Sequence, residues 1–258
     1  MSKNKTKNNT ALISTRPYEK NIALFKELEG TNILLLNHPL TEIKPLENYT
    51  KFDSIISNLE NYQHIIFIST NAVQFFVERL NNLTIKLPSN ITFSCIGPMT
   101  KEALENKFDI NVHCPKENYD SESLIKNKIF DYLQDKKILI IRGTGGRETL
   151  KNSLEEKGAK VDYGECYIRN YLPIEQKKLT QEIKECTSIF ILISSYGSAS
   201  NFNQHHGPWI EDYKTKFIVN HRNIASLLKS GYYGSRLNEV IVTDNLSAQS
   251  LLDIIKIH

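Results

Sequence analysis

Short strand-to-helix junctions recur along this chain at a nearly constant offset of roughly 125 residues. Four pairs of segments share that offset: 11–16 with 138–142, 65–72 with 190–197, 93–97 with 217–221, and 123–124 with 250–251. A single match of this kind has little weight, whereas four matches in register indicate a duplication. The chain is therefore expected to fold as two similar α/β halves that share one site.

Short apolar runs, rich in Ile, Val, Leu and Phe, predict strands that are buried on both faces, as in a parallel sheet covered by helices. These runs are 11–14, 33–36, 65–69, 91–96, 138–142, 161–167, 188–194, 217–219 and 239–242. The segments between them predict helices at 19–28, 71–80, 100–105, 121–134, 147–157, 223–229 and 248–256. The alternation predicts an α/β fold of two similar doubly wound parallel-sheet domains, each with three α/β/α layers.

The bulk composition is that of a globular protein and excludes several functions. Of the 258 residues, 40% are apolar and 24% are charged, and the formal net charge is +3. This charge is too small to indicate nucleic-acid binding. No apolar run reaches the roughly 20 residues that a membrane-spanning helix needs. The polar first ten residues lack the apolar core of a signal peptide, so we expect a cytoplasmic protein with a short disordered tail.

The four cysteines give no sign of a metal site. Cys95, Cys114, Cys166 and Cys186 are widely spaced, and no two of them form a C-x-x-C pair. Zinc sites with cysteine ligands usually contain such pairs, so we predict no metal. Reduced and mostly buried thiols are the expected state of all four.

The duplicated junctions lie at the carboxyl ends of the predicted strands, where open α/β sheets bind their ligands. Their small, polar and basic residues have two interpretations. Each can simply cap the helix that follows it, or the free N–H groups of the helix starts can bind an anion together with nearby arginines. The candidates for anion binding are Arg16, Ser69, Asn71, Gly97, Thr100, Arg142, Gly145, Ser194, Tyr196, Gly197, Asn220 and Arg222.

The glycine-rich turn at 143–146 does not match a nucleotide-binding motif. Glu148 stands where a dinucleotide fingerprint needs its third glycine, and no Gly-Lys-Ser/Thr follows for a P-loop. Glycine here is more consistent with a tight turn that lets a ligand approach the backbone. Arg142 and Arg147 beside it suit bidentate carboxylate binding, although a solvated surface charge explains each of them equally well.

Several of these segments resemble one enzyme family. The stretch 141–148, followed by Gly158-Ala159-Lys160-Val161 and Cys166-Tyr167-Ile168-Arg169, is similar to the central signature of bacterial uroporphyrinogen-III synthases. Weaker similarities in the correct order are Thr15-Arg16-Pro17, the stretch 67–73 and the stretch 96–104. The resemblance extends over nearly the whole chain, from residue 11 to the end.

The resemblance implies an enzyme that closes linear hydroxymethylbilane into uroporphyrinogen III, with inversion of ring D and loss of water, on the route to haem. Loss of the hydroxyl gives an azafulvene on ring A, ring D attacks to form a spiro-pyrrolenine, and this intermediate fragments and recloses. No metal or organic cofactor takes part. The bilane carries acetate and propionate groups, so it is a polyanion that suits anion-accepting helix starts.

The resemblance also assigns roles to residues. Tyr167 corresponds to the family's candidate acid for the loss of the hydroxyl, and we expect it to assist rather than to determine the rate. Ser69 and Thr100 correspond to substrate contacts. Ser194, Tyr196 and Lys216 are the candidates in the second half. The loop 221–224 departs from the Gly-Pro-Thr-Thr turn of some relatives, and Tyr196 stands where some relatives have serine.

Two domain arrangements follow from the same sequence. The repeat alone predicts consecutive halves near 10–130 and 136–258. The family instead places 1–38 with 172–258 in a discontinuous domain and 44–166 in an inserted domain, with hinge strands near 36–45 and 164–173. Breaks marked by proline at 39–45 and 170–173 agree with the family arrangement, which we prefer. Such a thin hinge predicts large domain motions.

Two other functions stay open at this point. A non-catalytic, two-lobed binder of a small anionic ligand has the same features, and a nucleotide-dependent enzyme is disfavoured by the failed fingerprints at 143–148. For the synthase, the expected partners are hydroxymethylbilane and, transiently, the preceding enzyme of the pathway. We expect a monomer.

Overall fold

The computed structural model describes residues 9–117, 119–204, 213–231 and 239–258. The chain divides into two compact units. Unit 1 consists of Met1–Glu42 and Asn170–His258, and unit 2 is the continuous segment Ile43–Arg169. Both boundaries fall inside strands, β3 (Thr41–Pro45) and β8 (Lys160–Tyr171), which are neighbours in one sheet.

The sheet of unit 1 has five strands in the order β11-β10-β9-β1-β2. All of its neighbouring strands are parallel. The strands are β1 (Thr10–Ser14), β2 (Ile33–Asn37), β9 (Ser188–Ile193), β10 (Lys214–Val219) and β11 (Glu239–Val242). Strand β1 pairs with β2 on one side and with β9 on the other, which joins the two ends of the chain in one sheet.

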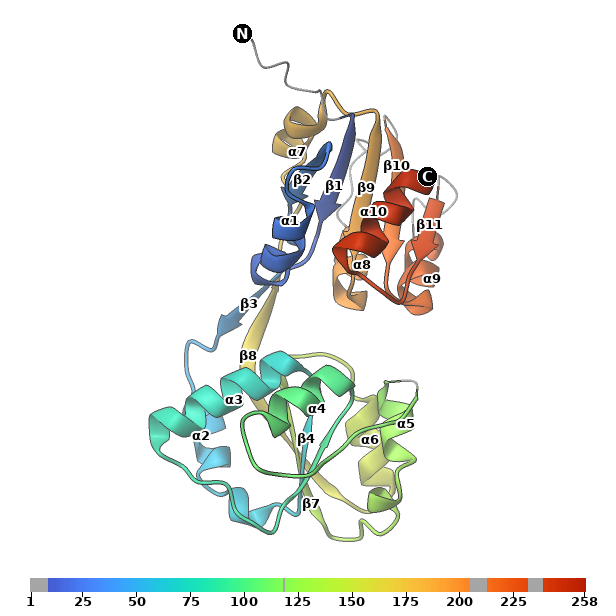
Figure 1. Ribbon diagram of the computed structural model, residues 1–258. Coiled ribbons are helices and arrows are strands. Elements are labelled where there is room, and N and C mark those ends of the chain that lie inside the picture. Colours follow the sequence, from blue (N-terminus) through green and yellow to red (C-terminus); the bar gives the residue numbers. More distant parts are fainter. Residues whose placement is uncertain (1–8, 118, 205–212, 232–238) are drawn as a thin grey trace. The chain divides into compact units, whose positions relative to one another are not determined.

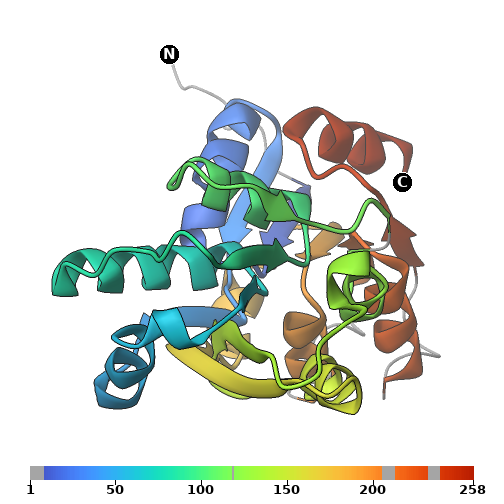
Figure 2. The ribbon, with the colours of Figure 1, turned by 90° about the horizontal axis from the view of Figure 1, so that it is seen from below.

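Helices cover both faces of this sheet (Figures 1 and 2). Leucines of α1 (Ile22–Leu28) and α10 (Ala248–Ile257) pack with Leu12 and Ile218 on one face. Helices α7 (Gln176–Ile183), α8 (Tyr196–Gln204) and α9 (Arg222–Ser230) bury their apolar residues against the other face. A short 3-10 helix, η1 (Tyr18–Lys20), precedes α1. Because alternate residues of a strand point to opposite faces, the continuous apolar runs supply both layers.

The sheet of unit 2 has six strands in the order β3-β8-β7-β4-β5-β6. Besides β3 and β8, its strands are β4 (His64–Phe67), β5 (Thr92–Cys95), β6 (Val112–His113) and β7 (Lys137–Gly143). The pairs from β8 to β6 are parallel, with one irregularity in the register at Arg142 and Gly143.

This second sheet is also covered on both faces. Helices α2 (Thr50–Ile56), α3 (Thr70–Leu83) and α4 (Pro98–Glu105) pack on the face that carries Ile65 and Phe67. Helices α5 (Ser121–Ile125) and α6 (Thr149–Glu156) pack on the face that carries Ile66. Two 3-10 helices, η2 (Leu59–Asn61) and η3 (Lys128–Phe130), complete the unit. The predicted α/β class with two parallel sheets is confirmed.

The two sheets have the same strand order once the repeat is taken into account. The order β2-β1-β9-β10-β11 in unit 1 corresponds to β8-β7-β4-β5-β6 in unit 2. Each matched pair of junctions therefore follows strands at equivalent positions in the two sheets. The alternative of consecutive halves at 10–130 and 136–258 is wrong, because β1 also pairs with β9 of the second half, and β4 of the first half pairs with β7 of the second.

Several element predictions need correction. The helix predicted at 121–134 ends at Ile125, and the Asn127 side chain then accepts a hydrogen bond from the backbone N–H of Ile129 and starts η3 instead. Strand β10 begins at Lys214, before the predicted residue 217. The sequence did not predict β3, β6, α2, α7, α8 and the short helix η2. Within the described ranges, no helix is long and apolar enough to span a membrane.

Candidate active site

Parallel strands place all their carboxyl ends at one edge of a sheet. In unit 2 this edge carries Ser69 after β4, Gly97 after β5 and the 143–146 turn at the end of β7. In unit 1 it carries Arg16 after β1, with further candidates after β9 and β10. Each unit therefore presents its own row of polar helix starts.

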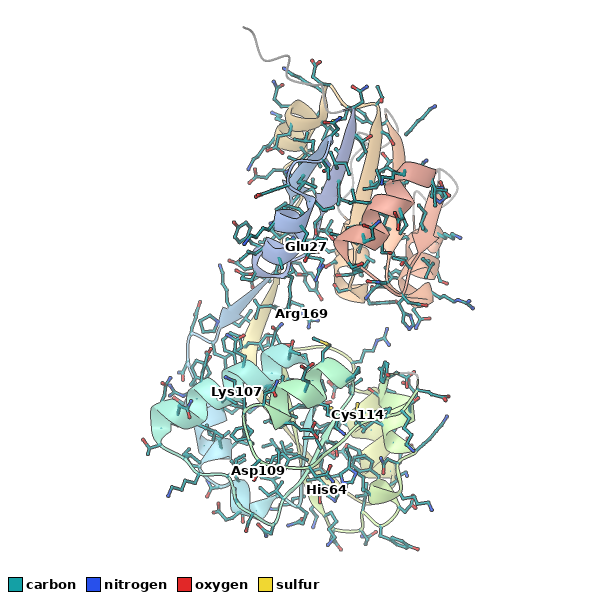
Figure 3. All side chains as sticks on the ribbon, viewed as in Figure 1. Glu27, His64, Lys107, Asp109, Cys114 and Arg169 are labelled. Atoms are coloured by element: carbon teal, nitrogen blue, oxygen red, sulfur yellow. The ribbon has the colours of Figure 1, made fainter. Side chains whose placement is uncertain are left out.

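Tyr167 lies on β8 and is completely buried, with 0% of its surface exposed. Its hydroxyl lies 3.2 Å from the Oγ of Ser69, which is 98 positions away in the sequence. The guanidinium of Arg169, labelled in Figure 3, donates a hydrogen bond of 3.4 Å to the same hydroxyl. The tyrosine ring stacks on Phe75 with centroids 5.5 Å apart. The structure thus brings together two residues that the sequence predicts for the site.

Gly143, which ends β7, makes room for this tyrosine. A Cβ atom at Gly143 would lie 2.5 Å from Cε2 of Tyr167, closer than any ordinary contact. Neither Gly143 nor Phe75 nor Arg169 was among the predicted site residues. A place for Arg169 beside Tyr167 is predictable from the sequence. Residues two apart on a strand point to the same side, and Arg169 follows Tyr167 by two positions.

Ser69 has a second role as the N-cap of α3. Its Oγ accepts a hydrogen bond of 3.1 Å from the backbone N–H of Ala72. Asn71 lies in the first turn of the same helix and is half-buried. A serine hydroxyl has two acceptor positions and one proton to donate. Ala72 donates to Ser69, and either hydroxyl can be the donor in the bond between Ser69 and Tyr167; when Tyr167 donates, the proton of Ser69 is available for a third partner.

Gly97 and Thr100 form the start of α4. Gly97 is the N-cap and has an extended φ of −138°, so it is not required here for a left-handed conformation. It offers no side chain to cap the helix, and Pro98 follows it. Thr100 is buried, and its N–H donates to the carbonyl of Gly97 at 3.1 Å.

Arg142 and Gly145 already have partners within unit 2. The guanidinium of Arg142, only 3% exposed as a residue, lies 3.5 Å from Glu148 and 4.3 Å from the centroid of the Tyr163 ring. The N–H of Gly145 donates to a carboxylate oxygen of Glu165 at 3.1 Å, in a turn where Gly145 has φ +67°. The turn therefore binds a carboxylate of the protein itself, and its contact with an anionic ligand stays a prediction.

Arg16 has a different environment in unit 1. It is half-buried just beyond β1, and burial lowers the pKa of its guanidinium. No carboxylate in the described part of the chain forms an ion pair with it. A partly desolvated charge without a counter-ion is costly, which makes Arg16 a good candidate for binding an anionic ligand.

A polar network that was not predicted from the sequence supports the backbone around Arg16. Ser14 donates to the Asn21 side chain at 2.9 Å, and Asn21 donates to Asn37 at the end of β2 and to the carbonyl of Arg16. Because Asn21 is itself buried, these bonds fix the segment between β1 and α1. No local motif signals this network, since its members lie in three separate segments.

The junction after β9 differs from its repeat partner by one residue. Ser195, not Ser194, caps α8, because its Oγ accepts a hydrogen bond from the N–H of Ser198 at 3.1 Å. Ser194 is half-buried, and Tyr196 is 46% exposed. Gly197 lies against Tyr171, whose hydroxyl would be 3.0 Å from an added Cβ.

The junction after β10 combines a cap with an unpaired acceptor. His221 caps α9, with its Nδ1 accepting from the N–H of Asn223 at 3.2 Å, so a histidine replaces the more usual hydroxyl or amide. Arg222 is exposed at the first position of the helix. The side-chain oxygen of Asn220 is buried and has no hydrogen-bond partner among the described residues, a state that is uncommon in folded proteins.

Lys216 is not brought to this edge. It lies in the amino-terminal half of β10, where its ammonium group is 3.8 Å from Glu239 and donates to the carbonyl of His258. Asn220 comes four positions later, which is about 13 Å along a strand. Lys216 does lie near the start of a strand, as predicted. The start of β10 is at the opposite edge of the sheet from the other candidate residues.

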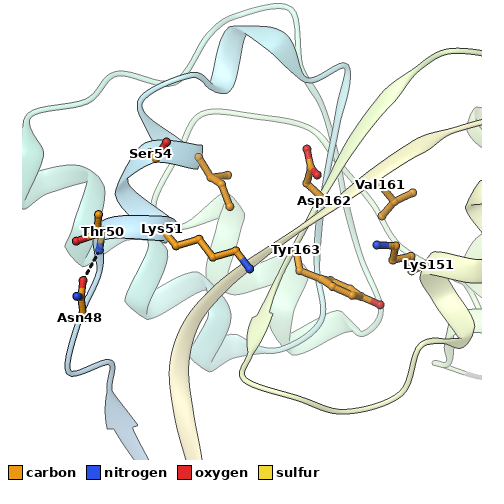
Figure 4. Close-up of a pocket in the computed structure, with 9 residues that line it drawn as sticks. Asn48, Thr50, Lys51, Ser54, Lys151, Val161, Asp162 and Tyr163 are labelled. Atoms are coloured by element: carbon orange, nitrogen blue, oxygen red, sulfur yellow. Dashed lines mark hydrogen bonds between the residues drawn. The ribbon is translucent and has the colours of Figure 1, made fainter.

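A cavity of about 710 Å³ lies in unit 2, and none of the predicted site residues lines it. Figure 4 shows Lys51 of α2, Lys151 of α6, and Asp162 and Tyr163 of β8 around it. The two β8 residues belong to the amino-terminal half of the strand, away from the carboxyl-end junctions. In the described ranges, no group of three or more His, Cys, Asp and Glu residues could hold a metal ion.

The fold and these junctions define a class of two-unit α/β proteins with polar, partly basic helix starts at the carboxyl edges of two parallel sheets. Residues 23–228 match the family model "Uroporphyrinogen-III synthase HemD". The chain belongs to the uroporphyrinogen-III synthase family and is a cyclising lyase of porphyrin biosynthesis.

Individual relatives agree with this assignment. The chain is 27% identical over 162 residues to the uroporphyrinogen-III synthase of Proteus mirabilis, covering 63% of this chain and 81% of the relative. It is 27% identical over 159 residues to that of Escherichia coli (strain K12), covering 62% of this chain and 65% of the relative.

Solved structures share the fold at low sequence identity. A mutant uroporphyrinogen III synthase from the extremely thermophilic bacterium Thermus thermophilus superposes with a TM-score of 0.69 at 14% identity, covering 96% of this chain and 97% of that one. The synthetase from Helicobacter pylori 26695 gives a TM-score of 0.59 at 17% identity, covering 95% and 98%.

Proposed function

We propose that this chain converts hydroxymethylbilane into uroporphyrinogen III, with inversion of ring D and loss of water. The observation that carries the proposal is the 3.2 Å contact between the hydroxyls of Tyr167 and Ser69 at the carboxyl end of β4. Loss of water requires a proton for the departing hydroxyl, and this pair of hydroxyls is held in place by buried packing.

The three side chains at this point suit stepwise delivery of a proton. Arg169 donates to the oxygen of Tyr167, which makes the phenol a better donor. Tyr167 donates to Ser69, and Ser69, which is half-buried, donates in turn to the hydroxyl that leaves ring A. The completely buried Tyr167 thus supplies its proton through Ser69 rather than by direct contact. The azafulvene then reacts with ring D through the spiro-pyrrolenine described above.

The acetate and propionate groups of the substrate need cationic and N–H partners. Arg16 is the strongest candidate, because its guanidinium is partly desolvated and has no carboxylate partner among the described residues. The helix starts at Gly97–Thr100 and at Asn220–Arg222 supply backbone N–H groups, and Ser194, Tyr196 and Gly197 are further candidates. Arg142, Gly145 and Lys216 are weaker candidates, since groups of the protein already occupy them.

The remaining expectations belong to the same proposal. A monomer in the cytoplasm would receive the bilane in transient contact with the preceding pathway enzyme. We also propose that the functional domains are those predicted from the sequence, 1–38 with 172–258 and 44–166. The observed units divide after Glu42 and after Arg169.

The reaction itself is the first test. The protein is supplied with hydroxymethylbilane, the product is oxidised, and the porphyrin isomers are separated. We expect the type III isomer in excess of the spontaneous type I product. Type I alone at the background rate would contradict the proposal and leave a non-catalytic binder of anionic ligands as the better description.

Tyr167→Phe tests the proton delivery. The variant is expected to lower kcat about tenfold, which corresponds to about 1.4 kcal/mol in the barrier, with little change in KM. Tyr62→Phe is the matched control, because Tyr62 is also a buried phenol of unit 2 and donates to Asp162 at 2.8 Å. It should lose stability and keep its kcat. Equal kcat values for the two variants would exclude a role of Tyr167 in the reaction.

A further inference from the structure

Two cysteines of unit 2 lie at the ends of neighbouring strands: Cys95 is the last residue of β5, and Cys114 directly follows β6. Strands β5 and β6 pair in parallel with Phe93 opposite Val112 and Ser94 opposite His113. Extended by one residue beyond β6, this register places Cys95 opposite Cys114. Side chains at paired positions point to the same face, and paired Cα atoms in a sheet lie about 5 Å apart. This spacing is within the range of about 4.4 to 6.8 Å that a disulfide spans.

The two thiols are neighbours but are not joined. Both cysteines are free, and Cys114 is close enough to act electrostatically on the thiol of Cys95. Cys95 is completely buried, and burial raises the pKa of its thiol well above its usual range. Cys114, labelled in Figure 3, is only half-buried. A small oxidant therefore meets Cys114 first, with Cys95 behind it.

We propose that Cys95 and Cys114 form a peroxide-sensitive dithiol that closes to a disulfide. The Cys114 thiolate attacks one oxygen of hydrogen peroxide, the O–O bond breaks, and the leaving hydroxide takes up the thiol proton as water. This step leaves a sulfenic acid on Cys114. Cys95 then attacks the Cys114 sulfur, the S–O bond breaks, and a second water leaves with the Cys95 proton. In total, two thiols lose two electrons and one peroxide gives two waters.

The other cysteines lack this arrangement. Cys166 is buried on β8, and its sulfur lies against the carbonyl oxygens of Ala72 and Arg142. Cys186 belongs to unit 1. Neither faces a second thiol in the described residues, so both are internal controls for the selectivity of oxidation.

The disulfide would act on the start of α4. The thiol of Cys95 donates to the carbonyl of Gly97 at 3.4 Å, and the same carbonyl accepts from the N–H groups of Thr100 and Lys101. A disulfide has no proton to donate, so oxidation removes the bond that ties this carbonyl to β5. This consequence rests on the proposed function, because it assumes that Gly97 and Thr100 bind substrate, whereas the chemistry of the dithiol does not.

The chemistry is tested on the full-length protein by peptide mapping. The protein is treated with a small excess of hydrogen peroxide, free thiols are blocked with N-ethylmaleimide, and the tryptic peptides are analysed by mass spectrometry. Lys101 and Lys107 separate the two cysteines, so a disulfide links two peptides. We expect that linked pair, two hydrogens lighter than the sum of its parts, and its disappearance after dithiothreitol.

The variants make the test selective. Cys114→Ser and Cys95→Ser should each abolish the linked pair, and Cys186→Ser should leave it unchanged. Sulfinic acid on Cys114 without a link, or equal oxidation of all four cysteines, would overturn the proposal. Should Cys95→Ser fail to fold, the map of the wild-type protein decides alone.

A separate measurement tests the effect on the substrate site. Peroxide should raise KM for hydroxymethylbilane at least threefold in the wild-type protein, reversibly with dithiothreitol, and leave Cys114→Ser unchanged. A disulfide that forms without a change in KM would support the dithiol and overturn the effect on α4. No turnover in any sample would instead contradict the proposed function, and the peptide map would be unaffected.

Discussion

Among single residues, Gly143 has the most direct control over the candidate site. Gly143→Ala would place a Cβ 2.5 Å from the Tyr167 ring, so the ring must move away from Ser69. We expect a loss of about 1–3 kcal/mol in the free energy of unfolding, as for other overpacked cores, together with a fall in kcat. Urea unfolding and the isomer assay measure the two effects.

Gly97→Ala is the matched control for this variant. The nearest atom to an added Cβ at Gly97 is 4.0 Å away, which is an ordinary contact. Its free energy of unfolding should change by less than about 1 kcal/mol. If the two alanine variants had the same stability, the close approach of Tyr167 to Gly143 would be refuted.

We expect Tyr163 to make the stability of the protein sensitive to alkaline pH. Burial and a hydrogen bond to Glu148 raise the pKa of its phenol to about 12, above the value of about 10 for an unfolded chain. The folded state therefore holds this proton more tightly, and the resulting stability is present below about pH 10 and is lost as the pH rises from there to about 12. Tyr163→Phe should lose less stability over this alkaline range than the wild-type protein.

The control for the alkaline effect is Tyr132→Phe, because Tyr132 is 90% exposed. Urea midpoints across the alkaline range give the comparison. A Tyr163→Phe curve parallel to those of the wild type and of Tyr132→Phe would show that Tyr163 does not hold its proton more tightly in the folded state.

Residue types were easier to predict from the sequence than residue partners. Arg142 and Gly145 are predicted from the sequence to bind an anionic ligand, which stays a prediction, and within the protein they contact the carboxylates of Glu148 and Glu165. Which carboxylate each binds depends on tertiary contacts that the local motif does not contain. Gly143 was overlooked for a related reason, since its requirement for glycine comes from a tyrosine on the neighbouring strand.

Among the elements, α3 links local helix chemistry to the candidate site through Ser69. Ser69→Ala removes the N-cap and should cost about 1 kcal/mol of stability. Ser247→Ala is the matched control, because Ser247 caps α10 in the same way and accepts from the N–H of Ser250. The two variants should lose similar stability in urea unfolding, and only Ser69→Ala should also lose kcat. A Ser69→Ala protein with normal kcat would reduce Ser69 to a helix cap.

The strands were easier to predict than the helices. All nine predicted strands exist, because strands buried on both faces leave continuous apolar runs. Helices α2, α7 and α8 were missed: α2 and α7 have seven and eight residues, and α8 begins inside a junction whose polar residues were assigned to ligand binding. The helix predicted at 121–134 is too long. Its apolar residues Phe130 and Leu133 are buried, as in a helix that faces the core, but no continuous helix joins them to α5.

At the scale of the whole molecule, the repeat correctly predicted two equivalent sheets but did not determine which segments of the chain form each of them. Matching junctions predict two equivalent sheets, and both sheets have the same strand order. The offset alone does not determine which strands share a sheet, because consecutive halves and an inserted unit give the same spacing. The family resemblance favoured the insertion, and the pairing of β1 with β9 excludes the consecutive halves. The expectation of one site shared by the two halves stays a prediction.

The apolar clusters imply that unit 2 can fold alone. Both clusters on its sheet are built only from residues between Ile43 and Arg169, and those of unit 1 contain none of them. A fragment of residues 43–169 should therefore show a single cooperative urea transition with native-like circular dichroism.

A fragment of residues 10–130 is the control, because it has a similar length but lacks β7 and β8. Its β4 therefore has no partner on one side, and its helices can pack on only part of the sheet. It should be unfolded or aggregated under the same conditions. Cooperative folding of 10–130, or its absence in 43–169, would contradict the division of the core between the two units.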